Sequence, residues 1–288
     1  MSDYVIYTDS GCDLSPEKLS EYGVKSLSLT YRFNDDDREY KTDDMPIHTF
    51  YQQMRDGRVA KTAAVNMEAF REAFEEELKA GRDVLYIGFS SGLSSTSESA
   101  QAAAQELREE YPDRKVIAID TLCASAGEGM LVWLASKKRA EGSSLEKTAE
   151  FIKNRYKNMC HWFTVDDLVY LKRGGRVSAA AALAGTVLGI KPVLHVDDEG
   201  HLVSMSKTRG RKQAIKALAQ KFTELCEEPH GGTYFISHSD CLADAKYLEE
   251  LIESAHGHKA ELITDVGPVI GAHSGPGTLA LFFFGKQR

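Results

Sequence analysis

The sequence lacks most of the features that mark secreted, membrane-spanning and nucleic-acid-binding proteins. No apolar run approaches the ~18 residues of a membrane span, and the N-terminus has neither the basic region nor the apolar run of a signal peptide. The five cysteines are odd in number and form no C-x-x-C spacing, which argues against a disulfide framework. The net charge of −8 disfavours nucleic acid as a partner, and it disfavours more than transient contact with anionic membranes. We therefore expect a cytoplasmic protein.

A nucleotide-binding loop and a metal site are not indicated either. The chain contains no G-x-x-x-x-G-K-S/T loop for phosphates. His256-Gly257-His258 lacks supporting cysteine or carboxylate spacing, so a polar turn is favoured over a metal site. Asp166-Asp167 is explained by capping and by the dipole of a helix start. We predict neither a metal nor a cofactor.

The first half of the chain has the pattern of an α/β domain. Short apolar runs, such as the one over 84–88, alternate with amphipathic segments, which is typical of a mostly parallel sheet with helices on both faces. Ser15, followed by Pro16, predicts one helix start, and Asn66 is a candidate cap for another. The period-two alternation over 27–33 predicts a further half-buried strand.

The second half has a different pattern. Apolar runs over 190–196 and 202–207 flank Asp197-Asp198-Glu199-Gly200, which predicts a hairpin. Helices then alternate with strands up to an apolar closing run over 279–284. This order predicts an α+β domain with a mixed sheet, and we place the domain boundary near residue 160.

Two segments offer hydroxyl groups next to helix starts. Phe89 to Thr96 reads F-S-S-G-L-S-S-T after a buried strand, where free backbone N–H groups favour an anion. In an open α/β sheet, ligands lie at the carboxyl ends of the strands. An ordinary capping loop explains this segment equally well. Thr62 offers a hydroxyl before the next helix, although Asn66 as the cap accounts for that segment alone.

Other segments carry charge or a shaped backbone. Arg173 and Arg176 flank a Gly-Gly turn, and they either hold an anion or are solvated cations at a helix end. The basic cluster over 207–212 is either a solvated face or a contact for an acidic ligand or partner. Asp9-Ser10 is best explained as an Asx turn. His273 lies in a segment rich in glycine and proline, for which we expect contact with a ligand.

Together these segments resemble the DegV family, whose better-understood members are fatty-acid-binding subunits of bacterial fatty acid kinase. The resemblance runs end to end, and its markers are Thr8-Asp9-Ser10, Ser90-Ser91-Gly92-Leu93-Ser94, Val165-Asp166-Asp167-Leu168, Leu171-Lys172-Arg173-Gly174-Gly175-Arg176, Leu188-Gly189-Ile190-Lys191-Pro192, Lys207-Thr208-Arg209-Gly210-Arg211 and the loop over 267–277. It implies a Rossmann-like α/β domain over 1–160 and an α+β domain over 161–288, with the ligand in the cleft between them.

The resemblance also implies a bound long-chain fatty acid. The hydroxyls that hold its carboxylate carry over onto Thr62 and Ser94, and His273 matches the loop histidine near the head group. Secondary contacts to the ligand or the kinase fall on Ser91, Arg173, Arg176 and Arg209. Ala63, Ser95 and Ser97 depart from the usual family residues, which bears on the preferred acyl chain.

The resulting expectation is a lipid-binding accessory subunit that presents the carboxylate to a kinase catalytic subunit and is not itself an enzyme. About fifteen buried methylenes contribute roughly 10 kcal/mol gross, whereas an unpaired buried carboxylate is prohibitive. The alanine-rich run over 178–184 either leaves room for an acyl chain or allows close helix packing. Two alternatives are a binding or regulatory module for another small anion, and a hydrolase. In the hydrolase, Ser94 is the nucleophile, His273 the base, and Asp9 or Asp120 the orienting acid.

Overall fold

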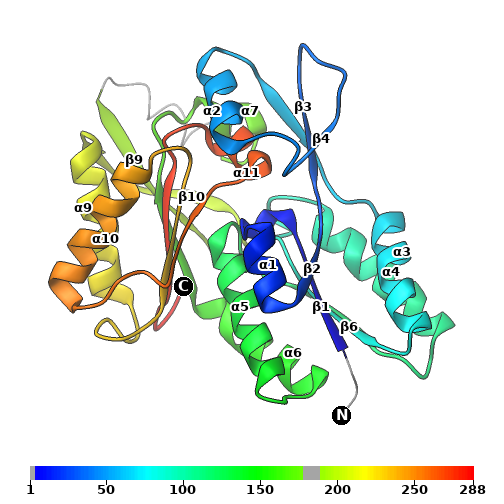
Figure 1. The fold of residues 1–288 in the computed structure, drawn as a ribbon. Coiled ribbons are helices and arrows are strands. Elements are labelled where there is room, and N and C mark those ends of the chain that lie inside the picture. The colour runs from blue at the N-terminus through cyan, green and yellow to red at the C-terminus, as the bar shows by residue number, and fades with distance from the viewer. Residues whose placement is uncertain (1–3, 178–188) are drawn as a thin grey trace.

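The computed structural model describes residues 4–177 and 189–288, and two sheets with one helix between them form its frame (Figure 1). The predicted alanine-rich run over 178–184 lies outside the described residues. The prediction of an α/β protein with one parallel and one mixed sheet is confirmed.

The first sheet is parallel throughout, in the order β2-β1-β6-β7. Its strands are β1 (Tyr4–Asp9), β2 (Val24–Leu27), β6 (Asp83–Gly88) and β7 (Val116–Asp120). On one face lie α3 (Met67–Lys79) and α4 (Thr96–Glu110), and on the other α1 (Pro16–Tyr22), α5 (Ala126–Ala140) and α6 (Leu145–Arg155). In this order β2 lies on one side of β1, whereas β6 and β7, which come later in the chain, lie on its other side. The carboxyl ends of β1 and β6 therefore border the crevice at which such sheets bind ligands.

The helix caps follow the sequence prediction. Ser15 accepts a hydrogen bond from the N–H of Lys18 at the start of α1, and Asn66 accepts one from Ala69 at the start of α3. These side chains satisfy N–H groups that a helix leaves without an internal partner.

The second sheet is mixed, in the order β10-β9-β8-β13-β11-β12. Its strands are β8 (Met159–Thr164), β9 (Ile190–Val196), β10 (Leu202–Arg209), β11 (Tyr234–His238), β12 (Leu262–Asp265) and β13 (Leu279–Phe284). The outer face packs against α9 (Arg211–Leu225) and α10 (Leu242–His256). The predicted hairpin is β9–β10. The predicted boundary at residue 160 falls inside β8, whose pairings all lie in this second sheet.

A small antiparallel sheet forms where one longer strand was expected. β2 ends at Leu27, and β3 (Thr30–Phe33) pairs instead with β4 (Tyr40–Lys41) and β5 (Ala60–Ala63). The prediction of a single strand over 27–33 is therefore wrong. Between these segments, the N–H of Leu29 donates to Ser10 Oγ at 3.0 Å, so the chain leaves the first sheet here.

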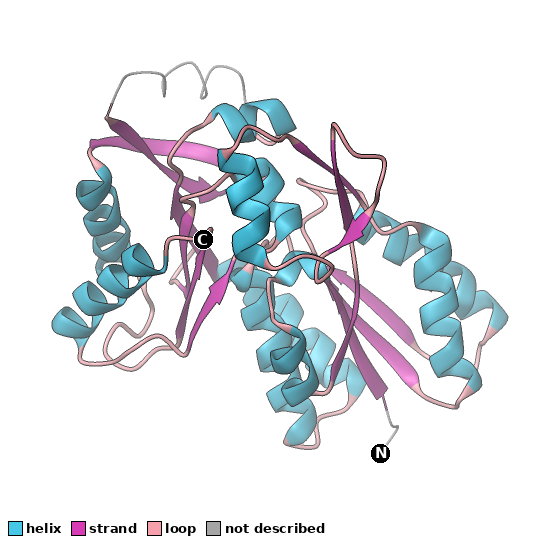
Figure 2. Cartoon of the chain, turned by 45° about the horizontal axis from the view of Figure 1, so that its top comes forward, coloured by secondary structure: helices cyan, strands magenta, loops and turns pink. Residues whose placement is uncertain are grey.

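The small sheet packs against the C-terminal half. With α2 (Ile47–Arg55), it forms a cluster of aromatic side chains around α11 (Pro268–Ser274), and Figure 2 shows these elements as one group. A segment from early in the sequence therefore covers a helix from near its end, close to α7 (Val169–Gly174).

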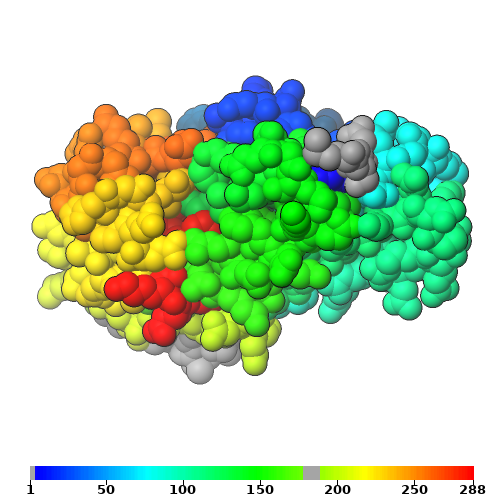
Figure 3. All heavy atoms as spheres, turned by 90° about the horizontal axis from the view of Figure 1, so that it is seen from below, coloured from blue at the N-terminus to red at the C-terminus, as the bar shows by residue number. Residues whose placement is uncertain are grey.

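Helix α5 is the element that joins the two main sheets. Its first turns are buried on nearly all sides, and it contacts β1 and β6 of one sheet and β8, β11 and β13 of the other. One hydrophobic core runs through it from Ile6 and Leu85 to Phe163 and Phe235. In Figure 3 the green segment of the chain lies between the yellow and orange segments on one side and the cyan segments on the other. No helix among the described residues combines the length and hydrophobicity that a membrane crossing needs.

Candidate ligand-binding site

A cavity of about 310 Å³ lies between the carboxyl edge of the parallel sheet, the inner face of the mixed sheet, and α11. This volume is near the lower end of the ~300–1,000 Å³ that is usual for ligand pockets. Its apolar wall is formed by Leu29, Ala64, Phe89, Leu93, Ala124, Phe163, Leu171, Val196, Leu202, Val266, Val269, Ile270, Ala280 and Phe282. Its polar lining is formed by Thr62, Ser94, Ser95, Ser125, His161, Arg176, Ser237, His273, Ser274 and Thr278.

Three residues predicted from the sequence meet at this cavity, and we call Thr62, Ser94 and His273 the hydroxyl–imidazole cluster. Thr62 Oγ1 lies 2.8 Å from His273 Nε2, which joins β5 to α11. His273 Nδ1 is buried and has no hydrogen-bond partner among the described residues. If Nε2 carries the proton and donates to Thr62, the threonine hydroxyl hydrogen is free to point into the cavity.

The imidazole of this cluster is neutral at physiological pH. Burial, together with the positive charge of Arg176, lowers the pKa of His273 to about 4. His273 is therefore a neutral hydrogen-bonding group, and the nearby positive charge is that of Arg176. The Arg176 side chain is fixed by donating to the Leu93 carbonyl at 3.1 Å and to the Gly174 carbonyl at 2.5 Å.

Ser94 reaches the cavity from the loop between β6 and α4. Its Oγ lies 2.9 Å from Thr96 Oγ1 and accepts from the Thr96 N–H at 3.3 Å. These contacts hold Ser94 at the start of a fifteen-residue helix, where the dipole favours negative charge. Ser94 thus both accepts from the first N–H of α4 and lines the cavity, whereas Ser95, at the N-cap position, makes no side-chain cap hydrogen bond.

The hydrolase alternative is not supported by the positions of its residues. Asp9 is fully buried and accepts from Gly11, Phe89 and the Tyr86 hydroxyl, as the predicted Asx turn requires. Asp120 accepts from the N–H groups of Ser91 and Leu122. Neither carboxylate orients His273, so the described residues contain no Ser94–His273–Asp triad.

A second serine tests the hydrolase alternative independently. Gly88-Phe89-Ser90-Ser91-Gly92 fits the G-x-S-x-G pattern, with Ser90 at the nucleophile position. However, Ser90 is fully buried, and its Oγ donates to the Gly200 carbonyl at 3.0 Å and accepts from the Gly92 N–H at 3.1 Å. No histidine is hydrogen-bonded to it in the described part of the chain, so this segment acts as a turn.

The remaining predicted residues lie at other places. Ser91 donates its backbone N–H to Asp120 and does not line the cavity. Arg173 is exposed on α7, with its guanidinium 5.7 Å from the centre of the Tyr170 ring. Arg209 is exposed at the end of β10. Of the four secondary residues, the structure brings Arg176 alone to the cavity.

Sequence reasoning missed several polar residues of the cavity. Ser125 follows β7, Ser237 lies in β11, and Ser274 and Thr278 flank the end of α11. Ser274 directly follows His273, for which a ligand contact was predicted, so its position in the sequence could have indicated that it lines the same cavity. His161 also lines the cavity, but its Nδ1 lies 3.1 Å from the Met159 carbonyl and its Nε2 accepts from the Ala124 N–H at 3.2 Å. Because both ring nitrogens are occupied, His161 is a structural residue.

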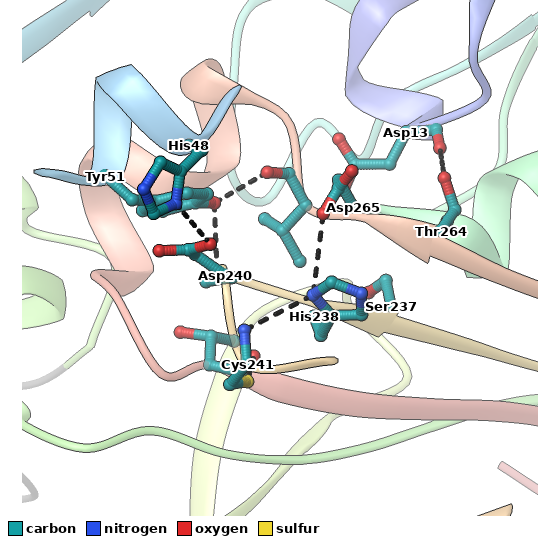
Figure 4. A network of polar contacts seen from close by, with 12 residues as sticks. Asp13, His48, Tyr51, Ser237, His238, Asp240, Cys241, Thr264 and Asp265 are labelled. Atoms are coloured by element: carbon teal, nitrogen blue, oxygen red, sulfur yellow. Dashed lines mark hydrogen bonds and ion pairs between the residues drawn. The ribbon is translucent and has the colours of Figure 1, made fainter. Parts of the chain in front are cut away.

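A polar network fastens α2 to the ends of β11 and β12 beside the cavity (Figure 4). The Tyr51 hydroxyl donates to the Val266 carbonyl at 2.6 Å and lies 3.0 Å from Ser239 Oγ. His48 Nδ1 lies 2.9 Å from Asp240 Oδ1 at the surface. The described residues hold no group of three or more histidine, cysteine or acidic side chains placed to bind a metal.

The two main sheets and the cavity between them define a two-domain α/β fold with a candidate site between the domains. The chain belongs to the DegV family, because residues 3–286 match the family model described as "Uncharacterised protein, DegV family". A DegV domain-containing protein of Clostridium perfringens is 41% identical over 291 residues, which cover 100% of this chain and 99% of that protein. The predicted family is confirmed.

Solved structures agree with this assignment. A DegV family protein from Thermus thermophilus, described by its fatty acid binding, has a TM-score of 0.87 and 30% identity, covering 99% of this chain and 100% of that one. DegV from Bacillus subtilis, described as a fatty acid binding protein, has a TM-score of 0.85 and 26% identity, with coverage of 99% and 100%. Both of these proteins are described by the fatty acid binding that they show.

Proposed function

We propose that this chain binds a long-chain fatty acid in the cavity and presents its carboxylate to a fatty acid kinase catalytic subunit, which forms the acyl phosphate. The hydroxyl–imidazole cluster at one end of an apolar cavity is the observation that carries the proposal. Thr62 and Ser94 donate hydroxyl hydrogens to the carboxylate, and His273 fixes Thr62. The neighbours that are described as fatty-acid-binding support the same ligand.

The physical chemistry of the cavity suits an amphipathic anion. Burying an acyl chain against the apolar wall contributes roughly 25 cal/mol for each Å² removed from water. A carboxylate in this setting needs charge-assisted hydrogen bonds, which the two hydroxyls and the start of α4 supply. Arg176 adds positive charge without a direct carboxylate partner among the described residues.

The head group would lie near the surface, as phosphoryl transfer from a partner requires. Thr62 lines both the cavity and a second hollow of about 330 Å³ formed by the small antiparallel sheet and its loop. The exposed cations Arg173 and Arg209 would contact the catalytic subunit. The nucleotide would be held by that subunit, and the reaction would take place in the bacterial cytoplasm.

Mass spectrometry of the organic extract from natively purified protein tests the ligand. A stoichiometric fatty acid is expected, before or after incubation with a fatty acid mixture. An extract without lipid in both cases would contradict the proposal and favour a different anion.

Charge reversal at Arg209 tests the partner. Arg209→Glu should abolish acyl phosphate formation with the cognate catalytic subunit and ATP, while the Kd for the fatty acid stays unchanged. Lys153→Glu, on an exposed position of α6, is the matched control and should retain activity. Unchanged turnover in Arg209→Glu would remove this residue from the partner contact.

A further inference from the structure

The cavity contains a second polar group that a simple acyl chain does not need. Asp13 Oδ1 accepts from the Gly267 N–H at 2.9 Å, and its Oδ2 accepts from Ser125 Oγ at 2.5 Å. Ser125 Oγ lies 2.9 Å from Ser237 Oγ. We call Asp13, Ser125 and Ser237 the hydroxyl relay. Asp13 and Ser237 are shown in Figure 4. Ser125 and Ser237 both line the cavity.

Above the raised Asp13 pKa of about 7, where this carboxyl is mostly ionised, the hydrogens of the relay have a defined order. An ionised Asp13 can only accept, so the single hydroxyl hydrogen of Ser125 points to Asp13. The Ser125–Ser237 bond must then use the hydrogen of Ser237. Ser237 Oγ is left with lone pairs for which the described residues provide no donor. This oxygen can therefore accept one further hydrogen bond from the contents of the cavity.

The backbone at Ser125 indicates that its hydroxyl is needed there. Ser125 has φ 54° and ψ −146°, a conformation that is unfavourable for residues other than glycine. The strain is offset by its N–H, which donates to the Gly11 carbonyl at 2.8 Å, and by its hydrogen bonds in the relay. Glycine would adopt this conformation without strain but would remove the hydroxyl from the cavity.

A further hydroxyl in the same cavity is independent of the relay. Ser274 is 5% exposed, lines the cavity, and its Oγ has no hydrogen-bond partner among the described residues. A hydroxyl is both donor and acceptor, so Ser274 can either donate a hydrogen bond to a polar ligand group or accept one from it.

The relay lies away from the position of the carboxylate. It is joined to Gly267, at the start of α11, whereas His273 is near the end of that helix. Six residues of helix separate the two positions, which is a rise of about 9 Å. A ligand group at the relay would therefore be in the middle of a long acyl chain and not next to its head group.

We propose that the preferred ligand is a long-chain fatty acid with a hydroxyl in mid-chain, whose hydrogen is donated to Ser237 Oγ. This inference rests on the proposed function and narrows its ligand class. A keto group at the same carbon cannot donate, so the relay distinguishes the two oxidation states of the chain.

The test compares the Kd values of delipidated protein for stearic acid and for hydroxystearic and ketostearic acids substituted in mid-chain. Buffer above the raised Asp13 pKa of about 7 keeps the relay in its ionised order. The best hydroxystearic isomer should bind roughly fivefold more tightly than stearic acid, as one additional hydrogen bond allows. The matching ketostearic acid should not share this gain.

Ser237→Ala should bring the stearic-to-hydroxystearic Kd ratio close to one. Ser125→Gly leaves the Ser237 acceptor in place and frees its hydrogen, so ketostearic acid should then share the gain. Ser136→Ala is the matched control, because Ser136 is buried on α5 but bonds only its own helix, at the Trp133 carbonyl. Thermal unfolding shows that each variant is folded. Stearic acid binding as tightly as every hydroxystearic isomer would overturn the inference and leave the proposed function intact, with water satisfying the relay. Failure to bind any of these acids would overturn the proposed function itself.

Discussion

The two ends of α11 differ in charge, and the difference sets the direction in which an amphipathic anion fits the cavity. At the end of the helix, neutral His273 and the positive charge of Arg176 accompany two hydroxyl donors. At its start, the carboxyl of Asp13 is buried beside the cavity. A ligand carboxylate placed there would be a second buried anion, which is strongly disfavoured. On the proposed function, a ligand carboxylate is therefore disfavoured at the start of α11 and favoured at its end.

The largest effect should follow from removing the donors of the hydroxyl–imidazole cluster. The double variant Thr62→Val, Ser94→Ala should weaken stearic acid binding about 100-fold, since hydrogen bonds to a charged group contribute about 1.5–3 kcal/mol each. Titration calorimetry of delipidated protein measures this. Thr223→Val, at an exposed position of α9, is the control. An unchanged Kd in the double variant would mean that the carboxylate lies elsewhere.

The pH dependence of stability should have opposite signs at the two ends. Burial raises the pKa of Asp13 from 3.8 to about 7, so the folded protein binds more protons than the unfolded chain in this range. Its contribution to the free energy of unfolding falls as pH rises. Burial lowers the pKa of His273 from 6.5 to about 4, so the unfolded chain binds more protons there. The contribution of His273 therefore rises with pH through the same range.

Asp13→Asn and His273→Gln separate these contributions. From about pH 4 to pH 7, the stability of Asp13→Asn relative to the native sequence should rise by on the order of 2 kcal/mol. The relative stability of His273→Gln should fall over this range by a similar or smaller amount. Urea unfolding of delipidated protein at a series of pH values measures both. Difference curves that are flat, or that share one sign, would remove the contrast between the two ends.

Tyr51→Phe should lower stability by about 1–2 kcal/mol, because the buried Val266 carbonyl loses its hydroxyl donor. This contact supports the start of α11 from α2, and Tyr51 itself does not line the cavity, so the Kd for stearic acid should change less than twofold. Thermal unfolding and calorimetry on the same sample measure the two effects. A large loss of affinity would show that α2 shapes the cavity as well as the fold.

The smallest effect should come from the exposed ion pair of the same network. Arg55 and Asp240 form a salt bridge in which the side chains are 37% and 22% exposed. Such pairs contribute about 0–1 kcal/mol, so Arg55→Gln should shift the urea midpoint only slightly. The variant should also lose the small salt dependence of that midpoint. A loss of stability as large as that of Tyr51→Phe would show that the ion pair, and not the buried hydroxyl, supports α11.

The sequence predicts the parts of this fold that depend on neighbouring residues. The caps at Ser15 and Asn66 and the hairpin turn over 197–200 are local, and they form as expected. The break after Leu27 is not visible in a period-two pattern, because residues of two different sheets can alternate in one continuous phase. That Thr62, Ser94 and His273 line one cavity was implied by the family resemblance, since residues so far apart carry no local signal.

The relay had no such signal in the sequence. Ser125, at the start of α5, and Ser237, near the end of β11, lie 112 residues apart. Each serine alone has the appearance of an ordinary loop or strand-end residue. Their pairing depends on how α5 sets the two sheets against each other, which propensity and periodicity do not encode.

The position of α5 also determines how a ligand can be exchanged. Because one continuous core passes from the parallel sheet through this helix to the mixed sheet, parting the two halves would expose that core to water. If a fatty acid is bound as proposed, it would be loaded and released while the halves stay together, and local motions around the cavity would set the rate of exchange. Amide hydrogen exchange in α5 should accordingly remain slow even while fatty acid turns over rapidly.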